Sequence, residues 1–516
     1  MLFALYAAVA SFLASFGTRA LAVRVGAMDE ARGGRKIHTR TTPLLGGMGV
    51  GCVLIGVILM ASSVHLLSFD GALKQRLLGF AASIVILMIG GFLDDRYRLS
   101  PVLQIIFPVL AALTVIGTGT SILEISSLQG HGVWSLDWWH GSQRIFGHVL
   151  SFVFPADVLT LAWLLGVTYA TKTMDGLDGL VTGHTVIGAA LILLLASSPS
   201  FYQPSIIALS WIVLGSFLGF LPWNIHPARQ FLGEAGSTLA GFSFGFLAIV
   251  SGAKVATAFM ALGIPLVDFA LVVLLRVRAG RSPFRGDDSH LHFRLLRLGF
   301  SQQQVAAMFW MLACIFGLSA LGLQTRGKGL LMIGLACVIV LLSLGAAAIR
   351  SLSSTARTRL FAMMCFVTVV VTLWSVAGLW RERVDMPQAV EVMLSGRPLV
   401  LEIADTQSKR TQGLSDRASM RIDHGMLFVF PKPERYTFWM PRMHFDLDIV
   451  WLNGDRVVDV ARLSALRSET EEPARYTPKE RADRVLELVA GQAERYEIKD
   501  GSVILELRVG AASDKE

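Results

Sequence analysis

Over its first 380 residues the chain alternates long apolar stretches with short polar connections. About twenty apolar residues in a helix cross the hydrocarbon core of a bilayer. About twelve runs approach that length: 2–23, 45–66, 75–93, 101–118, 157–174, 179–197, 204–222, 236–253, 255–275, 303–323, 329–349 and 359–380. The pattern predicts a polytopic α-helical membrane protein with about eleven or twelve transmembrane helices. No basic segment precedes the first run, which favours a retained helix over a cleaved signal peptide.

A second pattern begins after residue 384. Short apolar or alternating stretches predict β-strands at 398–404, 425–430 and 447–452. Asn453-Gly454 lies between two such stretches and predicts a hairpin turn, because both residues tolerate positive φ. Residues 478–489 begin with a proline and are followed by Gly491, which predicts a helix. Residues 384–516 are therefore expected to form a small, soluble, β-rich α+β domain behind a membrane-embedded domain of residues 1–380.

Composition supports this division. Charged residues make up 16% of the chain, against about 25% in a soluble domain. Their density is about 10% in residues 1–380 and about 33% in residues 381–516. The net charge of +8 arises in the apolar part, where basic loops set membrane orientation, so it does not indicate nucleic-acid binding. The cysteines all lie in apolar runs, which leaves the polar domain without a disulfide framework: Cys52, Cys314, Cys337 and Cys365.

The loop charges predict the orientation of the chain. With the N-terminus outside, the cytoplasmic loops hold 19 Lys and Arg residues and the opposite loops hold six. Basic residues collect on the cytoplasmic side, so we expect this orientation in the cytoplasmic (inner) membrane. An even helix count then places residues 384–516 outside, and an odd count places them in the cytoplasm. Segment 119–156 becomes an outside loop, whose tryptophans fit either an aromatic belt or an interfacial segment: Trp134, Trp138 and Trp139.

Polar clusters of unusual composition all fall on the predicted cytoplasmic side. The first, Arg35-Lys36-Ile37-His38, precedes Gly46-Gly47. Anchoring at the membrane surface explains its basic residues but not the histidine or the glycines. The second is Asp94-Asp95, at the end of an apolar run. Adjacent carboxylates at that depth are costly and suit metal–phosphate chemistry or proton abstraction, although a solvated helix end is the alternative.

The third cluster contains Asp175 and Asp178, each followed by glycine. The two acids share a face if the segment is helical, but Asp-Gly is equally common in turns. The fourth sets Glu234 between glycines at the start of a predicted helix, ten residues after Asn224. Free N–H groups at a helix start favour phosphate, so a magnesium–pyrophosphate site competes here with an ordinary helix cap.

The fifth cluster is His290-Leu291-His292-Phe293-Arg294. Two histidines at this spacing are poor zinc ligands, and no cysteine is nearby, so contacts to nucleotide phosphates are expected instead. Acids, histidines and basic residues on one membrane face are the groups that phosphoryl transfer requires. A transporter would place ionisable residues at mid-membrane, whereas these lie at the ends of the runs. A transporter, or a scaffold that displays the C-terminal domain, is the alternative from another class.

These five motifs, in this order over about residues 25–320, resemble the polyprenyl-phosphate N-acetylhexosamine-1-phosphate transferases of glycosyltransferase family 4. The resemblance implies that a polyprenyl (undecaprenyl) phosphate attacks the β-phosphate of a UDP-N-acetylhexosamine. The products would be polyprenyl-diphosphate-sugar and UMP, in a magnesium-dependent first membrane step of cell-envelope polysaccharide synthesis. The histidine loop looks like the GlcNAc-1-phosphate branch, and the phospho-MurNAc-pentapeptide translocase reaction is the alternative. A homo-oligomer is left open.

The resemblance also implies roles for individual residues. The catalytic residues would be Asp94, Asp95, Asp175 and Asp178, the first two acting on the lipid phosphate. Magnesium would be held by Glu234 and Asp175. The substrate-binding residues would be Lys36, His38, Lys172, Asn224, His290, His292 and Arg294. Two departures from the family pattern stand out: Glu234 replaces a usual Asp, and Lys172 replaces a common Asn and could contact phosphates as a cation.

Residues 388–508 resemble the domain of unknown function 192. The matching segments are 413–417, 425–430, 438–440 and 447–449. Members of that family are often exported, which agrees with an outside location, but the resemblance implies no reaction. Met426, Trp439 and Met440 either line a pocket or pack in the core.

Overall fold

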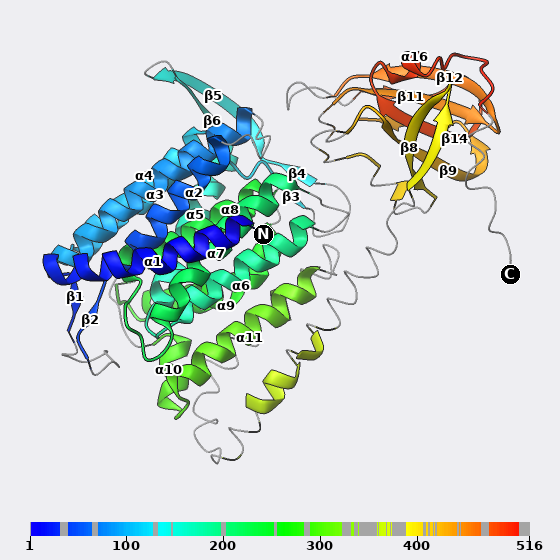
Figure 1. The fold of residues 1–516 in the computed structure, drawn as a ribbon. Coiled ribbons are helices and arrows are strands. Elements are labelled where there is room, and N and C mark those ends of the chain that lie inside the picture. Colours follow the sequence, from blue (N-terminus) through cyan, green and yellow to red (C-terminus); the bar gives the residue numbers. More distant parts are fainter. Residues whose placement is uncertain are drawn as a thin grey trace. The chain divides into compact units, whose positions relative to one another are not determined.

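The computed structural model describes residues 2–30, 40–63, 71–126, 133–145, 148–197, 203–251, 255–282 and 289–321, short pieces between 332 and 373, and most of 389–504. The chain separates into two compact units, one built almost entirely from residues up to Gly378 and the other from Leu379 onward. Figure 1 shows a helical first unit and a strand-rich second unit.

Ten of the predicted apolar runs are confirmed as helices. They are α1 (Leu2–Val25), α2 (Gly46–Ser63), α3 (Gly71–Tyr97), α4 (Pro101–Gly117), α5 (Ala156–Met174), α6 (Leu180–Ser197), α7 (Pro204–Asn224), α8 (Gly233–Val250), α9 (Val255–Arg278) and α11 (Gln302–Leu321). Among the described helices, six are long and apolar enough to cross a membrane: α1, α3, α6, α7, α8 and α11. The run at 329–349 lies mostly outside the described residues, whereas the described part of the run at 359–380 is helical, at 359, 361–367, 369–371 and 373. The first unit is therefore a multi-pass membrane domain.

Helix α8 forms the centre of the helical unit. All its residues from Ala235 to Ile249 are buried, and it packs against α2, α3 and α5. Small residues permit this close approach. A Cβ on Gly47 of α2 or on Gly91 of α3 would collide with the backbone of α8 at Gly236 or Ala235. The glycines thus bring the N-terminus of α8 against the start of α2 and the end of α3.

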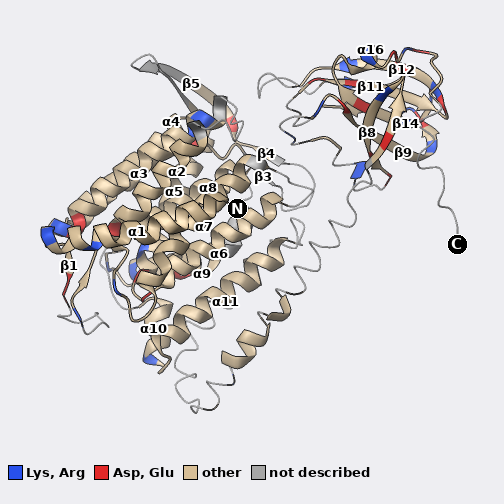
Figure 2. Ribbon diagram, viewed as in Figure 1, with Lys and Arg blue, Asp and Glu red and all other residues tan. Residues whose placement is uncertain are grey.

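The polar clusters gather at one end of this bundle. Helix α3 ends just after its acid pair, α5 ends before Asp175, and α8 begins at Gly233. At the same end, β1 (Met28–Asp29) pairs with β2 (Thr42–Pro43), and the N–H of Phe231 donates to the carbonyl of Pro43. Figure 2 shows that the bodies of the helices carry few charged residues, whereas charged residues gather near β1.

The segment after α4 contains two β-hairpins that the sequence analysis did not anticipate. Strands β3 (Glu124–Ser126) and β4 (Val133–Ser135) form one, and β5 (Asp137–Ile145) and β6 (His148–Pro155) form the other. Trp138 and Trp139 are exposed in the second hairpin. Because α4 leads away from the acid pair and α5 leads back toward Asp175, these hairpins lie at the opposite end of the bundle from the polar clusters.

The second unit is built on a six-stranded sheet of order β12-β11-β14-β9-β8-β7. The strands are β7 (Ala389–Leu394), β8 (Arg397–Ala404), β9 (His424–Glu434), β11 (Leu447–Asn453), β12 (Arg456–Leu463) and β14 (Ala482–Val489). All neighbours are antiparallel except β8 and β9. The predicted strands and the hairpin between β11 and β12 are confirmed. The two residues of its turn are Gly454 and Asp455, because Asn453 still pairs with Arg456, and only Gly454 has a positive φ, of 59°. Met426 and Met440 are buried in a core cluster, whereas Trp439, in the short strand β10 (Phe438–Trp439), is half exposed.

The helix predicted at 478–489 is wrong. Residues Ala482–Val489 form β14, which pairs with β9 on one side and β11 on the other. Its side chains are buried on both faces of the sheet, so its apolar residues do not alternate as they do in a half-buried strand. The apolar residues Val485, Leu486, Leu488 and Val489 instead have a spacing that also fits one face of a helix. A short helix, α16 (Gln492–Arg495), follows Gly491.

Candidate active site

Four carboxylates converge where α3 ends and α8 begins. Asp94, Asp95, Asp175 and Glu234 lie close enough for their negative charges to repel one another. Asp95 Oδ1 accepts a hydrogen bond of 2.9 Å from the backbone N–H of Glu234, one of the free N–H groups at a helix start. Gly233 has a positive φ of 70°, and a Cβ there would collide with the Asp95 carboxylate. A glycine at 233 is therefore needed for this contact.

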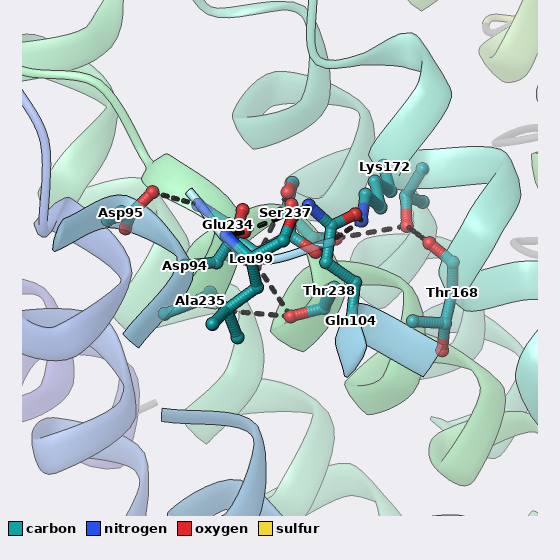
Figure 3. A network of polar contacts seen from close by, with 11 residues as sticks. Asp94, Asp95, Leu99, Gln104, Thr168, Lys172, Glu234, Ala235, Ser237 and Thr238 are labelled. Atoms are coloured by element: carbon teal, nitrogen blue, oxygen red, sulfur yellow. Dashed lines mark hydrogen bonds and ion pairs between the residues drawn. The ribbon is translucent and has the colours of Figure 1, made fainter. Parts of the chain in front are cut away.

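Lys172 is the cation of this cluster. Its Nζ lies 2.5 Å from Glu234 Oε1 and donates a 2.8 Å hydrogen bond to Gln104 Oε1. Gln104 Nε2 in turn donates to Asp94 Oδ1 over 2.9 Å. Figure 3 shows this continuous path from Asp94 through Gln104 and Lys172 to Glu234. The sequence analysis missed Gln104, although a single amide within an otherwise apolar run was a usable signal.

Asp175 lies in a turn between α5 and α6. Residues 175–179 are not helical, so a shared helix face does not relate Asp175 to Asp178, and Gly179 adopts a positive φ of 75°. Burial, with repulsion from Glu234 and Asp178, raises the pKa of Asp175 to about 7. A carboxyl group with a pKa near neutrality can take up or release a proton under physiological conditions.

The carboxylate of Asp178 holds the segment that follows α7. Its Oδ2 lies 2.7 Å from His226 Nδ1 and accepts the backbone N–H of Ala228 over 3.0 Å. The side chain of His226 is 37% exposed, and the sequence analysis missed this residue. Asn224 is buried, accepts from Thr182 Oγ1 over 2.6 Å and donates to the Gln230 carbonyl. Its side chain therefore braces the same segment from inside.

The two histidines of the fifth cluster lie at the start of α10 (Leu291–Arg297). Their rings stack with centroids 5.9 Å apart. Burial, reinforced by the neighbouring His290, lowers the pKa of His292 to about 3, so its ring is neutral. His292 Nε2 is buried without a hydrogen-bond partner in the described part of the chain, and it lies against Gly176. The fifth cluster therefore reaches the turn that carries Asp175.

The remaining predicted site residues divide into two groups. Arg294 is half-buried, and its Nε donates to the carbonyl of Ser289, which closes the turn before α10. Lys36 and His38 lie outside the described residues. The structure thus brings together the second, third, fourth and fifth clusters, and it places β1 and β2, which flank the first cluster, beside them.

The donor set at the acid cluster fits a hard divalent cation. Carboxylate oxygens are the ligands that Mg²⁺ prefers, and Asp95 Oδ2 is buried without a partner among the described residues. Four carboxylates face one lysine here. Over the described ranges, no three acidic, histidine or cysteine side chains form a ready-made ion cage. Mg²⁺ is commonly held by one or two carboxylates together with substrate phosphates, so the acid cluster suits an ion that arrives with a phosphorylated substrate.

Comparison with known proteins agrees with this geometry. The model of glycosyl transferase family 4 matches residues 77–252, a range that includes the acid cluster and Lys172. The "Phospho-N-acetylmuramoyl-pentapeptide-transferase" of Desulforamulus reducens is 30% identical over 296 residues, which cover 54% of this chain and 81% of that protein. The membrane helices and this site define an enzyme of the sugar-phosphate transferase class. The chain belongs to glycosyl transferase family 4.

Two further relatives carry a different substrate in their names. The "Probable undecaprenyl-phosphate N-acetylglucosaminyl 1-phosphate transferase" of Bacillus subtilis is 29% identical over 313 residues, or 59% of this chain and 79% of that protein. The "Decaprenyl-phosphate N-acetylglucosaminephosphotransferase" of Mycolicibacterium smegmatis is 28% identical over 366 residues, or 65% and 86%. Both relatives extend over more of this chain than the pentapeptide transferase does.

The second unit has relatives of its own. Residues 390–505 match the DUF192 family, described only as "Uncharacterized ACR", which confirms the resemblance inferred from the sequence. The crystal structure of a protein of unknown function from Novosphingobium aromaticivorans is 31% identical. The match covers 22% of this chain and 83% of that one, with a TM-score of 0.20. None of these descriptions assigns a reaction.

Proposed function

We propose that the chain transfers N-acetylglucosamine-1-phosphate from UDP-N-acetylglucosamine to a polyprenyl phosphate. An oxygen of the lipid phosphate attacks the β-phosphorus of the UDP-sugar, the bond from that phosphorus to the bridging oxygen breaks, and UMP leaves with that oxygen. The observation that carries the proposal is the Asp94–Gln104–Lys172–Glu234 network inside the region that matches the family. Such a network positions phosphates and balances their charge, which phosphoryl transfer requires.

Each member of the cluster has a proposed role. Asp94 and Asp95 position and deprotonate the lipid phosphate, and the unpartnered Asp95 Oδ2 is available for this contact. Lys172 neutralises charge on the transferred phosphate. Gln104 fixes the positions of Lys172 and Asp94 relative to each other, because it forms a hydrogen bond with each of them. Asp178 acts by holding His226 and the segment after α7, since its Oδ2 is occupied by both.

Glu234 and Asp175 would hold Mg²⁺. The ion, when bound, stabilises negative charge on the diphosphate and on the departing UMP. The residues at the nucleotide end of the substrate are Asn224, His290, His292 and Arg294, together with Lys36 and His38 of the first cluster. On the positive-inside count of 19 to six, this end of the bundle faces the cytoplasm, where UDP-sugars are made, and the second unit lies outside.

The pentapeptide-bearing substrate is the second candidate. It is favoured by the Desulforamulus relative, which has the higher identity. The GlcNAc substrate is favoured by the greater extent of the Bacillus and Mycolicibacterium matches. The two candidates differ in the group that the nucleotide carries, GlcNAc or MurNAc-pentapeptide, so a direct comparison of substrates decides between them.

The test is UMP release by the purified full-length protein in detergent. Undecaprenyl phosphate and Mg²⁺ are supplied with either UDP-GlcNAc or UDP-MurNAc-pentapeptide, and the lipid product is identified by mass spectrometry. We expect UMP and polyprenyl-diphosphate-GlcNAc, and no UMP without the lipid. A pentapeptide product alone would establish the second candidate, and absence of UMP with both sugars would refute transferase activity. Asp500→Asn, an exposed change in the second unit, is the control for Asp→Asn variants of the cluster.

A further inference from the structure

Asp268 is a buried acid in the middle of α9 that binds the start of α10. Its Oδ2 lies 2.8 Å from His290 Nδ1, and its Oδ1 accepts the backbone N–H of Leu291 over 3.0 Å. The side chains of Asp268 and His290 are only 8% and 7% exposed. An ionisable residue within an apolar helix is costly, so its two hydrogen bonds fix both the carboxylate and the chain that it holds.

The contact determines which nitrogen of His290 is available. An ionised carboxylate only accepts hydrogen bonds, so Nδ1 carries the hydrogen and Nε2 is the other nitrogen. Within the described part of the chain, His290 Nε2 has no hydrogen-bond partner. Asp268 therefore fixes the ring plane and the direction in which Nε2 points.

His290 is placed one ring away from the acid cluster. It stacks on His292 with an angle of 11° between the ring planes. His292 in turn lies against Gly176, in the turn that carries Asp175. Asp268 holds the His290 ring through Nδ1 and leaves Nε2 without a partner in the described part of the chain. A ring held in this way is suited to contact a substrate that binds at the acid cluster.

The same arrangement occurs a second time in the molecule. Asp178 binds His226 through Nδ1 and also accepts a nearby backbone N–H, that of Ala228. In both cases an aspartate fixes a histidine together with the main chain beside it. Two loops that border the Asp175 turn are thus held by the same pair of interactions, which is the arrangement expected where ring orientation matters.

We propose that Asp268 is a positioning residue of the transfer reaction, which directs His290 Nε2 at a phosphate of the bound nucleotide. The proposal rests on the proposed function, because it assigns His290 to the nucleotide end of the same substrate. The competing explanation is that Asp268 only anchors α10 and that His290 makes no substrate contact.

A double-mutant cycle distinguishes these explanations. The wild-type protein, Asp268→Asn, His290→Gln and the double variant are compared by steady-state UMP release. We expect Asp268→Asn to lower kcat/KM for the UDP-sugar by about 10- to 100-fold, the size of the effect when a metal-bound histidine loses its supporting hydrogen-bond partner, with KM for the lipid phosphate unchanged. In the His290→Gln background, Asp268→Asn should have no further effect. Asp500→Asn should leave every parameter at the wild-type value.

Direct binding of UMP, measured by calorimetry on the same proteins, keeps the test independent of turnover. We expect Asp268→Asn to weaken UMP binding in the wild-type background and not in the His290→Gln background. The proposal would be overturned if the effects of the two substitutions on kcat/KM or on UMP affinity multiplied in the double variant. It would also be overturned if Asp268→Asn raised KM equally for both substrates and lowered the melting temperature. If the wild-type protein binds UMP but transfers no sugar, the proposed function fails while the binding cycle still decides the role of Asp268. Should Asp268→Asn not fold, Asp268→Glu takes its place, because it keeps the charge but displaces it by one methylene.

Discussion

Lys172 Nζ and Glu234 Oε1 lie 2.5 Å apart, in a pair whose side chains are 20% and 15% exposed. The lysine thus neutralises the carboxylate that we propose as a magnesium ligand. An ammonium and a divalent cation that share one carboxylate oxygen compete for it. The pair therefore links the occupancy of the proposed magnesium site to the position of Lys172.

Removing this competition should strengthen metal binding. We expect Lys172→Gln to raise the affinity for Mn²⁺, a spectroscopic substitute for Mg²⁺, by about fivefold, which corresponds to about 1 kcal/mol for a partly buried pair. Turnover should fall at the same time, because the transferred phosphate loses a cation. Electron paramagnetic resonance titration of Mn²⁺ measures the first effect and UMP release the second. Lys479→Gln, on the exposed surface of the second unit, is the control, and an unchanged or weaker Mn²⁺ affinity would contradict the competition.

The carboxylates should be needed for turnover but not for folding. Asp94→Asn, Asp95→Asn and Glu234→Gln should each lower kcat by roughly two to four orders of magnitude, since each removes charge at the reacting phosphates. Asparagine at 95 can still accept the N–H of Glu234, so the start of α8 should remain in place. Melting temperatures in detergent should therefore stay near the wild-type value. Near wild-type rates in all three variants would argue against the proposed site.

The glycines at the helix crossings should control the geometry of the cluster. A Cβ on Gly91 would collide with the backbone of Ala235, next to Glu234. We expect Gly91→Ala to destabilise the protein by about 1–3 kcal/mol, the usual cost of overpacking, and to lower activity by displacing Asp95 from α8. Gly166→Ala in α5 is the matched control, because a Cβ there has no neighbour within 4 Å. Equal melting temperatures and rates for the two variants would disprove this packing role.

The sequence predicted most helices well, because a run of about twenty apolar residues has few alternatives in a membrane protein. It also placed Asp94, Asp95 and Glu234 at helix ends, where the structure has them. It could not reveal the partners of Gln104 or Asp268. Each is a single polar residue in an apolar run, and its partner lies far away in the chain. Strand β14 was misread for a related reason, since distant parts of the unit bury the side chains on both of its faces and remove the alternation that marks a half-buried strand.

The second unit should fold without the first. It has its own six-stranded sheet and its own hydrophobic clusters, so residues 384–516 should express as a soluble protein. In the full-length chain, a single cysteine introduced into the Gly454-Asp455 turn should react with a membrane-impermeant maleimide in intact cells, because the proposed topology places this unit outside. The same variant in lysed cells is the control for reactivity. Labelling only after lysis would mean that the unit lies on the cytoplasmic side.

Glu487 should make the stability of this second unit depend on pH. Its side chain is buried on β14 beside Met426 of β9, and Oε2 has no hydrogen-bond partner in the described part of the unit. Burial raises the pKa of Glu487 to about 8, although the nearby Arg417 acts in the opposite direction. In the unfolded chain a glutamate has a pKa of about 4.3. Between these two values the folded state holds a proton that the unfolded state has released.

The free energy of unfolding should therefore be highest at low pH, as far as this group is concerned, and should fall as the pH rises from about 4.3 to about 8. The slope approaches roughly 1.4 kcal/mol per pH unit at most. Denaturant unfolding of residues 384–516 at pH 5, 6, 7 and 8 measures it. Glu487→Gln, which cannot ionise, should remove this fall, whereas Glu480→Gln at an exposed position should not. If the free energy of unfolding of the Glu487→Gln protein fell by the same amount between pH 5 and pH 8, another group would be responsible. Only ionisation of the carboxyl group at 487 predicts that this substitution removes the fall.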